Sequence, residues 1–257
     1  MYEIIKNEQL KDNTYILEVN APLIAKSIKP GEFVIIMVDN MAERIPMAVY
    51  EVKGDNLVIL YDVKGYSTNE LKNTKSIFSI LGPLGKESIL TSNIDKYKDK
   101  KICFIVNGTG VASIKRISLE LNKNDIVNDI YYFEHGLTDE EVLKDEEISS
   151  TISNYDVVFT VGSFEFMENI VEKAKVLNKE VLVSLAPLML DGVGLCGACR
   201  VLINGNIKFA CIDGPEFNGL EVDFDSAKKR MKLFKTEEGR RYLQETEGNT
   251  FKPEEVK

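Results

Sequence analysis

The chain has 257 residues, enough for two compact domains or for two domains and a small appendage. Its formal net charge of −9 argues against binding to nucleic acid or to an anionic membrane surface, and no apolar run reaches the roughly 20 residues that span a bilayer. Because the first residues also lack the basic and apolar regions of a signal peptide, we expect a cytoplasmic protein whose thiols stay reduced.

Short runs of β-branched and aromatic residues dominate the first part of the chain. The runs are TYILEVNA, GEFVIIMV, MAVYEVKGDNLVILYDV and SIFSILGPLG, and turn signals at residues 29–31 and 54–56 separate them. Strands spaced in this way predict a small antiparallel β-barrel over residues 1–97. The charged stretch NIDKYKDKK at its end reads as a linker.

After this linker, apolar strands alternate with helices. KICFIV is a continuous apolar strand, followed by NGTGVASI and a helical KRISLELNKN. The later strands DIYYFEHG, YDVVFTVG and EVLVSLAP are separated by a predicted helix over residues 138–146 and by another over about residues 165–177. The alternation predicts a Rossmann-like parallel sheet with right-handed crossovers over residues 98–186.

The remaining segment, residues 187–257, combines a cysteine-rich stretch with a terminal helix. The helix is expected to begin at Asp225 or Ser226 as its N-cap, since short polar side chains accept hydrogen bonds from first-turn amides. One apolar stripe is predicted along it. The stripe consists of Met231, Leu233 and Phe234.

Three of the four cysteines lie close together in this segment. Cys196 and Cys199 have C-x-x-C spacing, and Cys211 follows a short strand-like excursion. In a reducing compartment this pattern indicates a metal site, and zinc and a 2Fe–2S cluster each take four ligands. Cys103 lies in an apolar strand and is interpreted as a buried core thiol. The candidate fourth ligand is therefore an oxygen, and Asp191 stands five residues before Cys196.

The stretch LMLDGVGLCGACRVLINGNIKFACIDGPEFNG resembles the cluster-binding segment of the small subunit of electron-bifurcating NADH-dependent ferredoxin:NADP oxidoreductase. It also resembles sulfide dehydrogenase beta subunits. In that family three Cys and one Asp hold a 2Fe–2S cluster, whereas the related electron-transfer subunit of dihydroorotate dehydrogenase B has Cys at the Asp position. The resemblance implies that Asp191, Cys196, Cys199 and Cys211 bind such a cluster; a zinc knuckle is the alternative.

The resemblance also implies an FAD site in the first domain. Residues 44–48, RIPMA, are similar to the R-I-P-L-T of the bifurcating subunit. Arg44 is expected to pair with the flavin pyrophosphate, for which a planar guanidinium is well suited, and the backbone of Pro46 and Met47 to face the isoalloxazine ring. Taken alone, Arg44 reads equally well as a solvated surface charge.

Two further glycine-containing motifs match that family. GYST is similar to its G-K-T-T loop, where backbone amides and hydroxyls meet phosphate, and GPLG is similar to a loop near the domain junction. Without its neighbours GPLG is an ordinary turn. The expected cofactor-binding residues in these motifs are Gly65, Ser67, Thr68, Gly82 and Gly85.

A candidate NAD(P)(H) loop follows the strand KICFIV. Gly108 and Gly110 stand where a glycine-rich loop opens a helix and can present amides to a pyrophosphate. The next loop of the family usually supplies an Arg, and here it reads His135, Gly136, Leu137. Loss of that cation argues against a preference for NADPH. Gly162 and Met167 fit a later loop beside the nicotinamide.

The resemblance therefore implies an electron-transfer flavoprotein subunit, in which FAD and a 2Fe–2S cluster pass electrons between a nicotinamide and a larger flavin and iron–sulfur partner subunit. No catalytic acid–base residue is expected, because the cofactors carry the chemistry. One alternative is pairing with a dihydroorotate dehydrogenase catalytic subunit, against which Asp191 argues. Another is a non-catalytic redox or assembly module that has lost nucleotide turnover.

Overall fold

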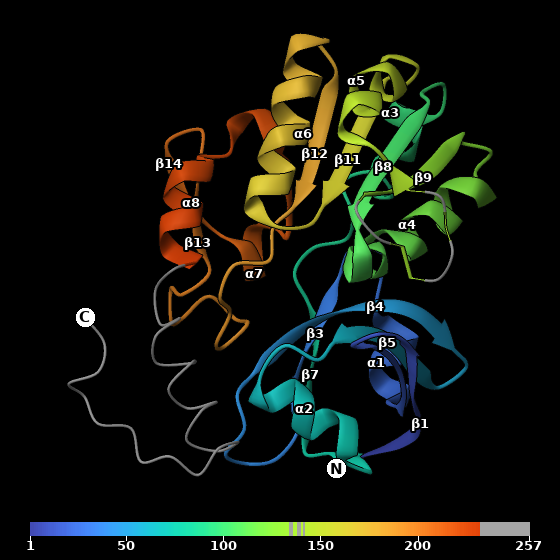
Figure 1. The fold of residues 1–257 in the computed structure, drawn as a ribbon. Coiled ribbons are helices and arrows are strands. Elements are labelled where there is room, and N and C mark those ends of the chain that lie inside the picture. The colour runs from blue at the N-terminus through green and yellow to red at the C-terminus, as the bar shows by residue number, and fades with distance from the viewer. Residues whose placement is uncertain (134–135, 138–139, 141, 232–257) are drawn as a thin grey trace.

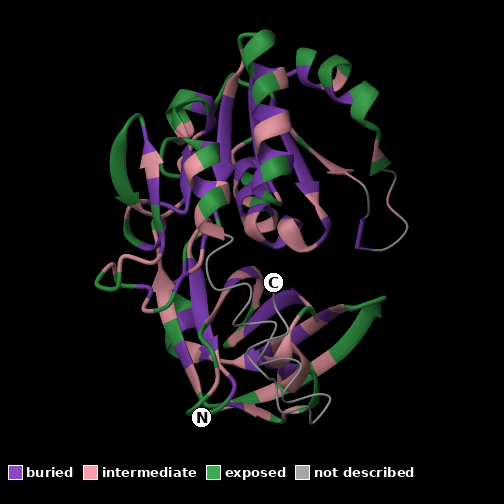
Figure 2. Cartoon of the chain, turned by 60° about the vertical axis from the view of Figure 1, so that its left-hand side comes forward, coloured by how far each residue is buried: buried purple, intermediate pink, exposed green. Residues whose placement is uncertain are grey.

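The structure is a computed structural model, and it describes residues 1–133, 136, 137, 140 and 142–231. Two sheets, a short hairpin and the surrounding helices make up this part of the chain (Figure 1). Buried residues run along the central strands of both sheets, and exposed residues lie on the outer faces of the helices, on the outer strands and in the loops (Figure 2). Among the described residues, no helix is long and apolar enough to cross a membrane.

The first sheet has seven strands in the order β6-β1-β2-β5-β4-β3-β7, and all its strand pairs are antiparallel. In β2 the inward-facing Tyr15, Leu17 and Val19 alternate with partly exposed residues, as expected for a strand with one face on a core. The sheet confirms the predicted antiparallel barrel. Its elements are β1 (Tyr2–Lys11), β2 (Thr14–Asn20), α1 (Pro22–Ser27), β3 (Phe33–Met37), β4 (Ile45–Lys53), β5 (Asn56–Asp62), α2 (Tyr66–Asn73), β6 (Ser76–Ile77) and β7 (Ser79–Leu84).

The second sheet has six strands in the order β10-β9-β8-β11-β12-β15, parallel except for the antiparallel β15. Its central strands are apolar on both faces because α4 covers one face and α5 and α6 cover the other. The sheet confirms the predicted parallel α/β architecture. Its elements are β8 (Ile102–Asn107), η1 (Gly108–Gly110), α4 (Val111–Lys123), β9 (Asn128–Phe133), β10 (Val142–Leu143), α5 (Asp145–Ser153), β11 (Val157–Val161), α6 (Phe164–Val176), β12 (Glu180–Ser184) and β15 (Glu216–Asn218).

One predicted helix of this sheet is wrong. In place of a helix over residues 138–146, β10 (Val142–Leu143) pairs in parallel with the end of β9, and the helix α5 begins only at Asp145. The Glu147 carboxylate accepts a hydrogen bond from the Lys144 amide at 2.9 Å, which fixes the helix start there. Strand pairing thus overrides the helix propensity of the glutamates.

The third segment contains the hairpin of β13 (Arg200–Ile203) and β14 (Asn206–Phe209), then α7 (Ala210–Asp213), η2 (Gly219–Glu221) and α8 (Phe224–Met231). The predicted N-cap of α8 is two to three residues late, because the Asp223 carboxylate accepts the Ser226 amide at 2.9 Å and the helix begins at Phe224. Leu233 and Phe234 lie outside the described residues.

The two sheets are joined by polar and apolar contacts around α4 and the predicted linker. Arg116 of α4 donates to the carbonyls of Ile28, at 2.7 Å, and Lys29, at 3.0 Å, at the end of α1. The predicted linker contains a short helix, α3 (Ile94–Tyr97), whose Tyr97 is fully buried and donates to the Glu180 carboxylate at 2.8 Å. The charged linker is therefore packed against the second sheet.

Candidate functional site

The β13–β14 hairpin brings two of the predicted ligands together. The Sγ atoms of Cys199 and Cys211 lie 3.2 Å apart, and each residue is 1% exposed. The Ala210 amide donates to the Cys199 carbonyl at 3.1 Å, which holds the end of the hairpin closed beside Cys211. Burial is the main cause that raises the pKa of the Cys211 thiol, so a metal ion must displace its proton on binding. Cys196 is exposed.

Asp191 lies in the loop that precedes Cys196. Its Oδ1 accepts the Val193 and Gly194 amides at 2.9 and 3.2 Å, and its Oδ2 accepts the Cys196 amide at 2.5 Å. Burial alone raises the pKa of this carboxyl group, but the amide hydrogen bonds outweigh it and hold the pKa below its ordinary value. Within the described ranges, no group of three or more His, Cys, Asp or Glu side chains is already gathered at metal-binding positions.

The donor set nevertheless fits a thiolate-bound metal centre. Two buried sulfur atoms already touch, and the third cysteine and the carboxylate stand on the loop that wraps them. Gly194 has a φ of +80° and packs against Ile212, next to Cys211, so the loop closes in a conformation that L side chains rarely adopt. Cys103, the remaining cysteine, is fully buried in β8 and confirms the interpretation as a core thiol.

The loop of residues 190–196, called the cysteine loop here, packs directly on the barrel. A Cβ on Gly192 would lie 2.7 Å from Ile35 Cδ1 of β3 and 2.8 Å from Leu84 Cδ1 of β7, so the loop backbone lies against these side chains. Arg44, just before β4, donates from Nη1 to the Leu190 carbonyl at 3.4 Å and is otherwise exposed. The predicted pyrophosphate-binding Arg therefore stands beside the loop that carries Asp191.

Pro46 and Met47 lie at the junction of the two sheets. They line a pocket of about 60 Å³, together with Ser113 and Arg116 of α4 and Leu185 after β12. Met47 is buried, and Pro46 is partly exposed. This pocket is smaller than a flavin ring, and most of the residues that line it are apolar. Pro46 and Met47 follow Arg44 closely in the sequence.

The GYST motif forms the start of α2 instead of an open loop. Thr68 Oγ1 accepts the Lys64 and Gly65 amides at 3.0 and 3.1 Å and thereby caps the helix. Ser67 is buried and donates to the Glu43 carboxylate at 2.7 Å. Both hydroxyls thus have protein partners. The sequence did not predict that Glu43 lies at this site; the one feature that could have indicated it is its position beside Arg44.

The two glycines of GPLG make packing contacts. A Cβ on Gly82 would lie 2.7 Å from Val34 Cγ1, and one on Gly85 would lie 3.0 Å from both Phe33 and Pro215. The Lys86 amide also donates to the Gly214 carbonyl at 2.8 Å. This turn therefore connects the barrel to the segment that follows Cys211.

The glycine-rich loop forms η1 at the start of α4. A Cβ on Gly110 would lie 3.0 Å from the Val161 carbonyl, so the loop approaches β11 closely. The role of Gly108 and Gly110 in binding a nucleotide stays a prediction. Thr109 donates from Oγ1 to the Asp62 carboxylate at 3.0 Å. Burial raises the pKa of Asp62, but hydrogen bonds from Lys64, Thr14 and Thr109 outweigh it and lower the pKa overall.

The other residues predicted around the nucleotide differ in where they lie. Leu137 is buried, and His135 lies outside the described residues. Gly162 packs against Phe166 of α6. Met167 lies in α6, with its side chain fully buried in the core, so only Gly162 of this pair lies in the loop before the helix. The position of that loop beside a nicotinamide stays a prediction.

Comparison with known proteins supports this architecture. Residues 187–223 match the iron–sulfur cluster binding domain of dihydroorotate dehydrogenase B. The chain is 31% identical to a Thermotoga maritima protein named dihydroorotate dehydrogenase B (NAD(+)), electron transfer subunit homolog, over 92% of this chain and 92% of that protein. A solved structure of NADH-dependent reduced ferredoxin-NADP oxidoreductase aligns with a TM-score of 0.79 and 28% identity, over 95% of this chain and 98% of its own.

A more distant structure defines the fold class. Ferredoxin-NADP+ reductase from Plasmodium falciparum aligns with a TM-score of 0.53 and 17% identity, over 71% of this chain and 94% of its own. The barrel followed by a parallel α/β sheet is thus the ferredoxin reductase fold, to which this chain adds an iron–sulfur cluster binding segment. The chain belongs to the family of dihydroorotate dehydrogenase B electron-transfer subunits.

Proposed function

We propose that the chain is the subunit in which electrons from a nicotinamide nucleotide reach a 2Fe–2S cluster by way of FAD. When bound, FAD supplies hydride acceptance and the cluster supplies one-electron transfer. The observation that carries the proposal is the packing of the cysteine loop on the barrel, through Gly192 against Ile35 and Leu84 and through Arg44 against Leu190. This packing sets the candidate cluster ligands beside the candidate flavin residues.

The chain's own residues hold and orient the cofactors in this proposal. Asp191, Cys196, Cys199 and Cys211 bind the cluster, and the Asp191 loop amides limit how far the carboxylate can move. Arg44 binds the flavin pyrophosphate, and the first turn of α2, which begins at Tyr66, adds its backbone amides. Pro46 and Met47 contact the flavin ring, and Gly108 and Gly110 approach the nicotinamide nucleotide.

A larger flavin and iron–sulfur subunit is proposed as the partner that receives the electrons, which makes the chain one part of a ferredoxin:NADP oxidoreductase-type complex. The alternative partner is a dihydroorotate dehydrogenase catalytic subunit, as in the names of relatives. Mixing the purified chain with each kind of subunit and following dihydroorotate oxidation and ferredoxin reduction separately distinguishes the two.

The first test is the ultraviolet–visible spectrum of the anaerobically purified protein, with iron and zinc assayed on the same sample. We expect flavin bands overlaid by broad iron–sulfur absorption and about two irons per chain, as a 2Fe–2S centre requires. A colourless protein with one zinc per chain contradicts the proposal, because the cysteines then only stabilise the fold.

One observation favours a second function, a redox or assembly module without nucleotide turnover. The Asp62 carboxylate accepts a hydrogen bond from Thr109, which lies inside the loop that would bind a pyrophosphate. The negative carboxylate would repel the negative phosphates there. Stopped-flow mixing with NADH separates the two functions. Rapid bleaching of the flavin excludes the module, whereas no bleaching with NADH or NADPH excludes the reductase.

A further inference from the structure

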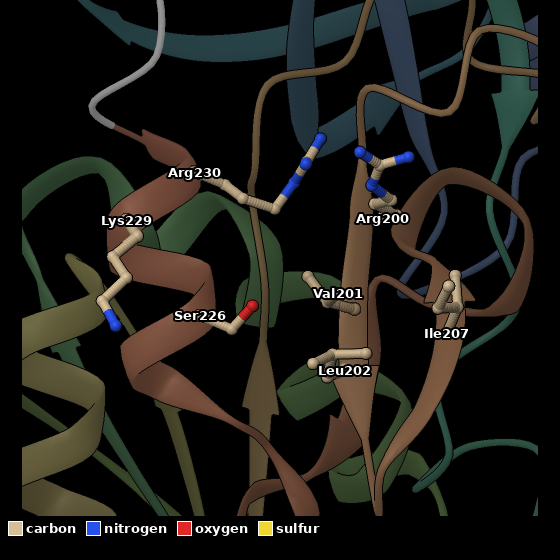
Figure 3. Close-up of a pocket in the computed structure, with 7 residues that line it drawn as sticks. All are labelled: Arg200, Val201, Leu202, Ile207, Ser226, Lys229 and Arg230. Carbon is tan, nitrogen blue, oxygen red and sulfur yellow. The ribbon is translucent and has the colours of Figure 1, made fainter.

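A second pocket, separate from the proposed flavin and nucleotide sites, lies in the cysteine segment. Its volume is about 330 Å³, within the range of small-molecule sites, and it lies between the β13–β14 hairpin and α8 (Figure 3). Val201, Leu202 and Ile207 form its apolar lining. Arg200, Ser226, Lys229 and Arg230 supply its polar and cationic groups.

The three cations of this pocket have no carboxylate partner within the described part of the chain. The neighbouring Lys228 of α8 is different, because it pairs with Glu168 at 2.7 Å and with Asp225 at 3.1 Å. In a chain with a net charge of −9, unpaired cations gathered around one cavity are not explained by a shortage of carboxylates.

The arginines are arranged as the cationic end of this pocket. Figure 3 shows the guanidinium groups of Arg200 and Arg230 turned toward the same end. Arg230 donates from Nη2 to the Ala198 carbonyl at 3.0 Å, while its Nε is buried and finds no hydrogen-bond acceptor among the described residues. A buried donor without an acceptor is costly, and two adjacent like charges add to that cost. An oxyanion bound beside the two guanidinium groups offsets the repulsion between them.

We propose that this pocket binds a small organic carboxylate, with its oxyanion between Arg200 and Arg230 and its apolar body against Val201, Leu202 and Ile207. Guanidinium groups match the geometry of a carboxylate, and the apolar lining favours a ligand with a hydrocarbon body over a fully hydrated ion. The site goes beyond the proposed electron transfer. It lies within the cysteine segment, since Arg200 follows Cys199 and Arg230 contacts Ala198.

The test is isothermal titration calorimetry of the full chain, as purified, in a buffer of low ionic strength, with benzoate and acetate as probes. We expect one saturable benzoate site per chain. Acetate should bind about tenfold more weakly, since burying the ring against the apolar lining adds the equivalent of roughly two methylene groups of transfer free energy. Equal affinity for both probes, or no saturable binding, overturns the proposal.

Variants locate the site. Arg200→Gln should weaken benzoate binding about tenfold or more without loss of fold, because no hydrogen bond of its side chain within the described residues is lost. Arg230→Gln should do the same, with circular dichroism as the check on folding. The control Lys123→Gln removes an exposed lysine of α4 and should leave affinity unchanged. Unaltered binding by Arg200→Gln contradicts the proposal, and binding does not require FAD, so failed electron transfer is a separate result.

Discussion

Glu43 is the residue whose charge most directly opposes the proposed flavin site. Its carboxylate holds Ser67 and stands next to Arg44, where the pyrophosphate is expected. We predict that Glu43→Gln binds FAD about five- to tenfold more tightly, on the order of 1 kcal/mol, because a negative charge is removed near the phosphates. The dissociation constant of FAD with the apoprotein, measured by flavin fluorescence, checks this.

Glu51→Gln provides the matched control for this prediction. It makes the same change of charge on β4, where Glu51 lies 3.4 Å from Lys53, and should leave FAD affinity unaltered. Weaker FAD binding in the Glu43 variant would show instead that the Glu43–Ser67 hydrogen bond shapes the site.

Glu216 is a buried carboxyl group with only neutral hydrogen-bond donors. Its Oε2 accepts Ser88 Oγ at 2.9 Å and the Ile89 amide at 2.8 Å. Burial raises the pKa of Glu216 to about 7, and these two hydrogen bonds offset the rise only in part. The residue thus connects β15 to the chain that leaves the barrel at the cost of burying an ionisable group.

The raised pKa predicts a pH dependence of stability. Below pH 4.5 the carboxyl is protonated in both states, and between about pH 4.5 and 7 only the folded chain keeps the proton. The free energy of unfolding should therefore fall through this window, by up to about 3 kcal/mol from this residue, and change no further above pH 7.

Glu216→Gln tests this dependence, since the amide oxygen can still accept both hydrogen bonds. Urea unfolding at pH 5 and pH 8 should show that the variant lacks this loss and is more stable than the unaltered protein at pH 8. Glu221→Gln, at an exposed residue, should behave like the unaltered protein. An equal pH dependence for Glu216→Gln and the unaltered protein contradicts the prediction.

At the scale of single residues, the sequence predicts site residues that lie close together along the chain. The C-x-x-C pattern, Cys211 and Asp191 all lie within 21 residues, so their proximity follows from a short loop and a hairpin. Asp62 reaches Thr109 across 47 residues, and this contact depends on how α4 docks on the barrel. No local pattern contains that information.

Among the elements, the cysteine loop depends on a glycine where it meets the barrel. Gly192 has a φ of +74° and contacts Ile35 and Leu84, whereas Gly54 has a φ of +59° and a Cβ added there would meet no atom within 4 Å. Both Gly→Ala variants should lose about 1–2 kcal/mol to backbone strain. Gly192→Ala should lose roughly 1 kcal/mol more, because it also pushes the loop off the barrel.

Urea unfolding of the two variants measures the difference, and the iron content of each gives a second readout. Gly192→Ala should retain less iron than Gly54→Ala, since its substitution lies beside Asp191. Equal losses of stability and of iron would mean that the loop does not rely on this contact.

Elements with a strong apolar period were predictable, and short ones were not. The predicted helix over residues 165–177 is found as α6 (Phe164–Val176), whose buried residues recur at helical spacing. The glutamate-rich residues 138–146 have helix-forming side chains, yet Val142 and Leu143 pair with Tyr132 and Phe133 instead. Two residues of β10 are too few to show a period, so only the neighbouring strand explains them.

For the whole molecule, Arg116 fastens the second sheet to the barrel. Its side chain donates to the carbonyls of Ile28 and Lys29, and Arg116→Met leaves both without this donor. We predict a loss of about 1–3 kcal/mol in the free energy of unfolding. Urea unfolding should show no such loss for Lys115→Met on the same helix. Equal stability of the two variants would mean that the hydrogen bonds of Arg116 to Ile28 and Lys29 do not stabilise the protein.

The order of the two architectures could be read from the sequence, because separated β-branched runs and alternating strands and helices are distinct patterns. The membership of β15 in the second sheet could not. Its three residues follow Cys211, far along the chain from β12, with which they pair through Leu182, Val183 and Ser184. The hydrogen bonds of Arg116 to Ile28 and Lys29 could not be predicted from the sequence either, since a helix arginine usually faces solvent.

The late position of β15 has a consequence for synthesis of the chain. While the ribosome is still translating the residues that follow β12, the edge of β12 has no partner and presents free amides and carbonyls to other nascent chains. Only when Asn218 has emerged can that edge be covered. The segment that follows residue 186 therefore also covers the edge of β12. A chain truncated after residue 186 should be prone to aggregate, because that edge stays exposed.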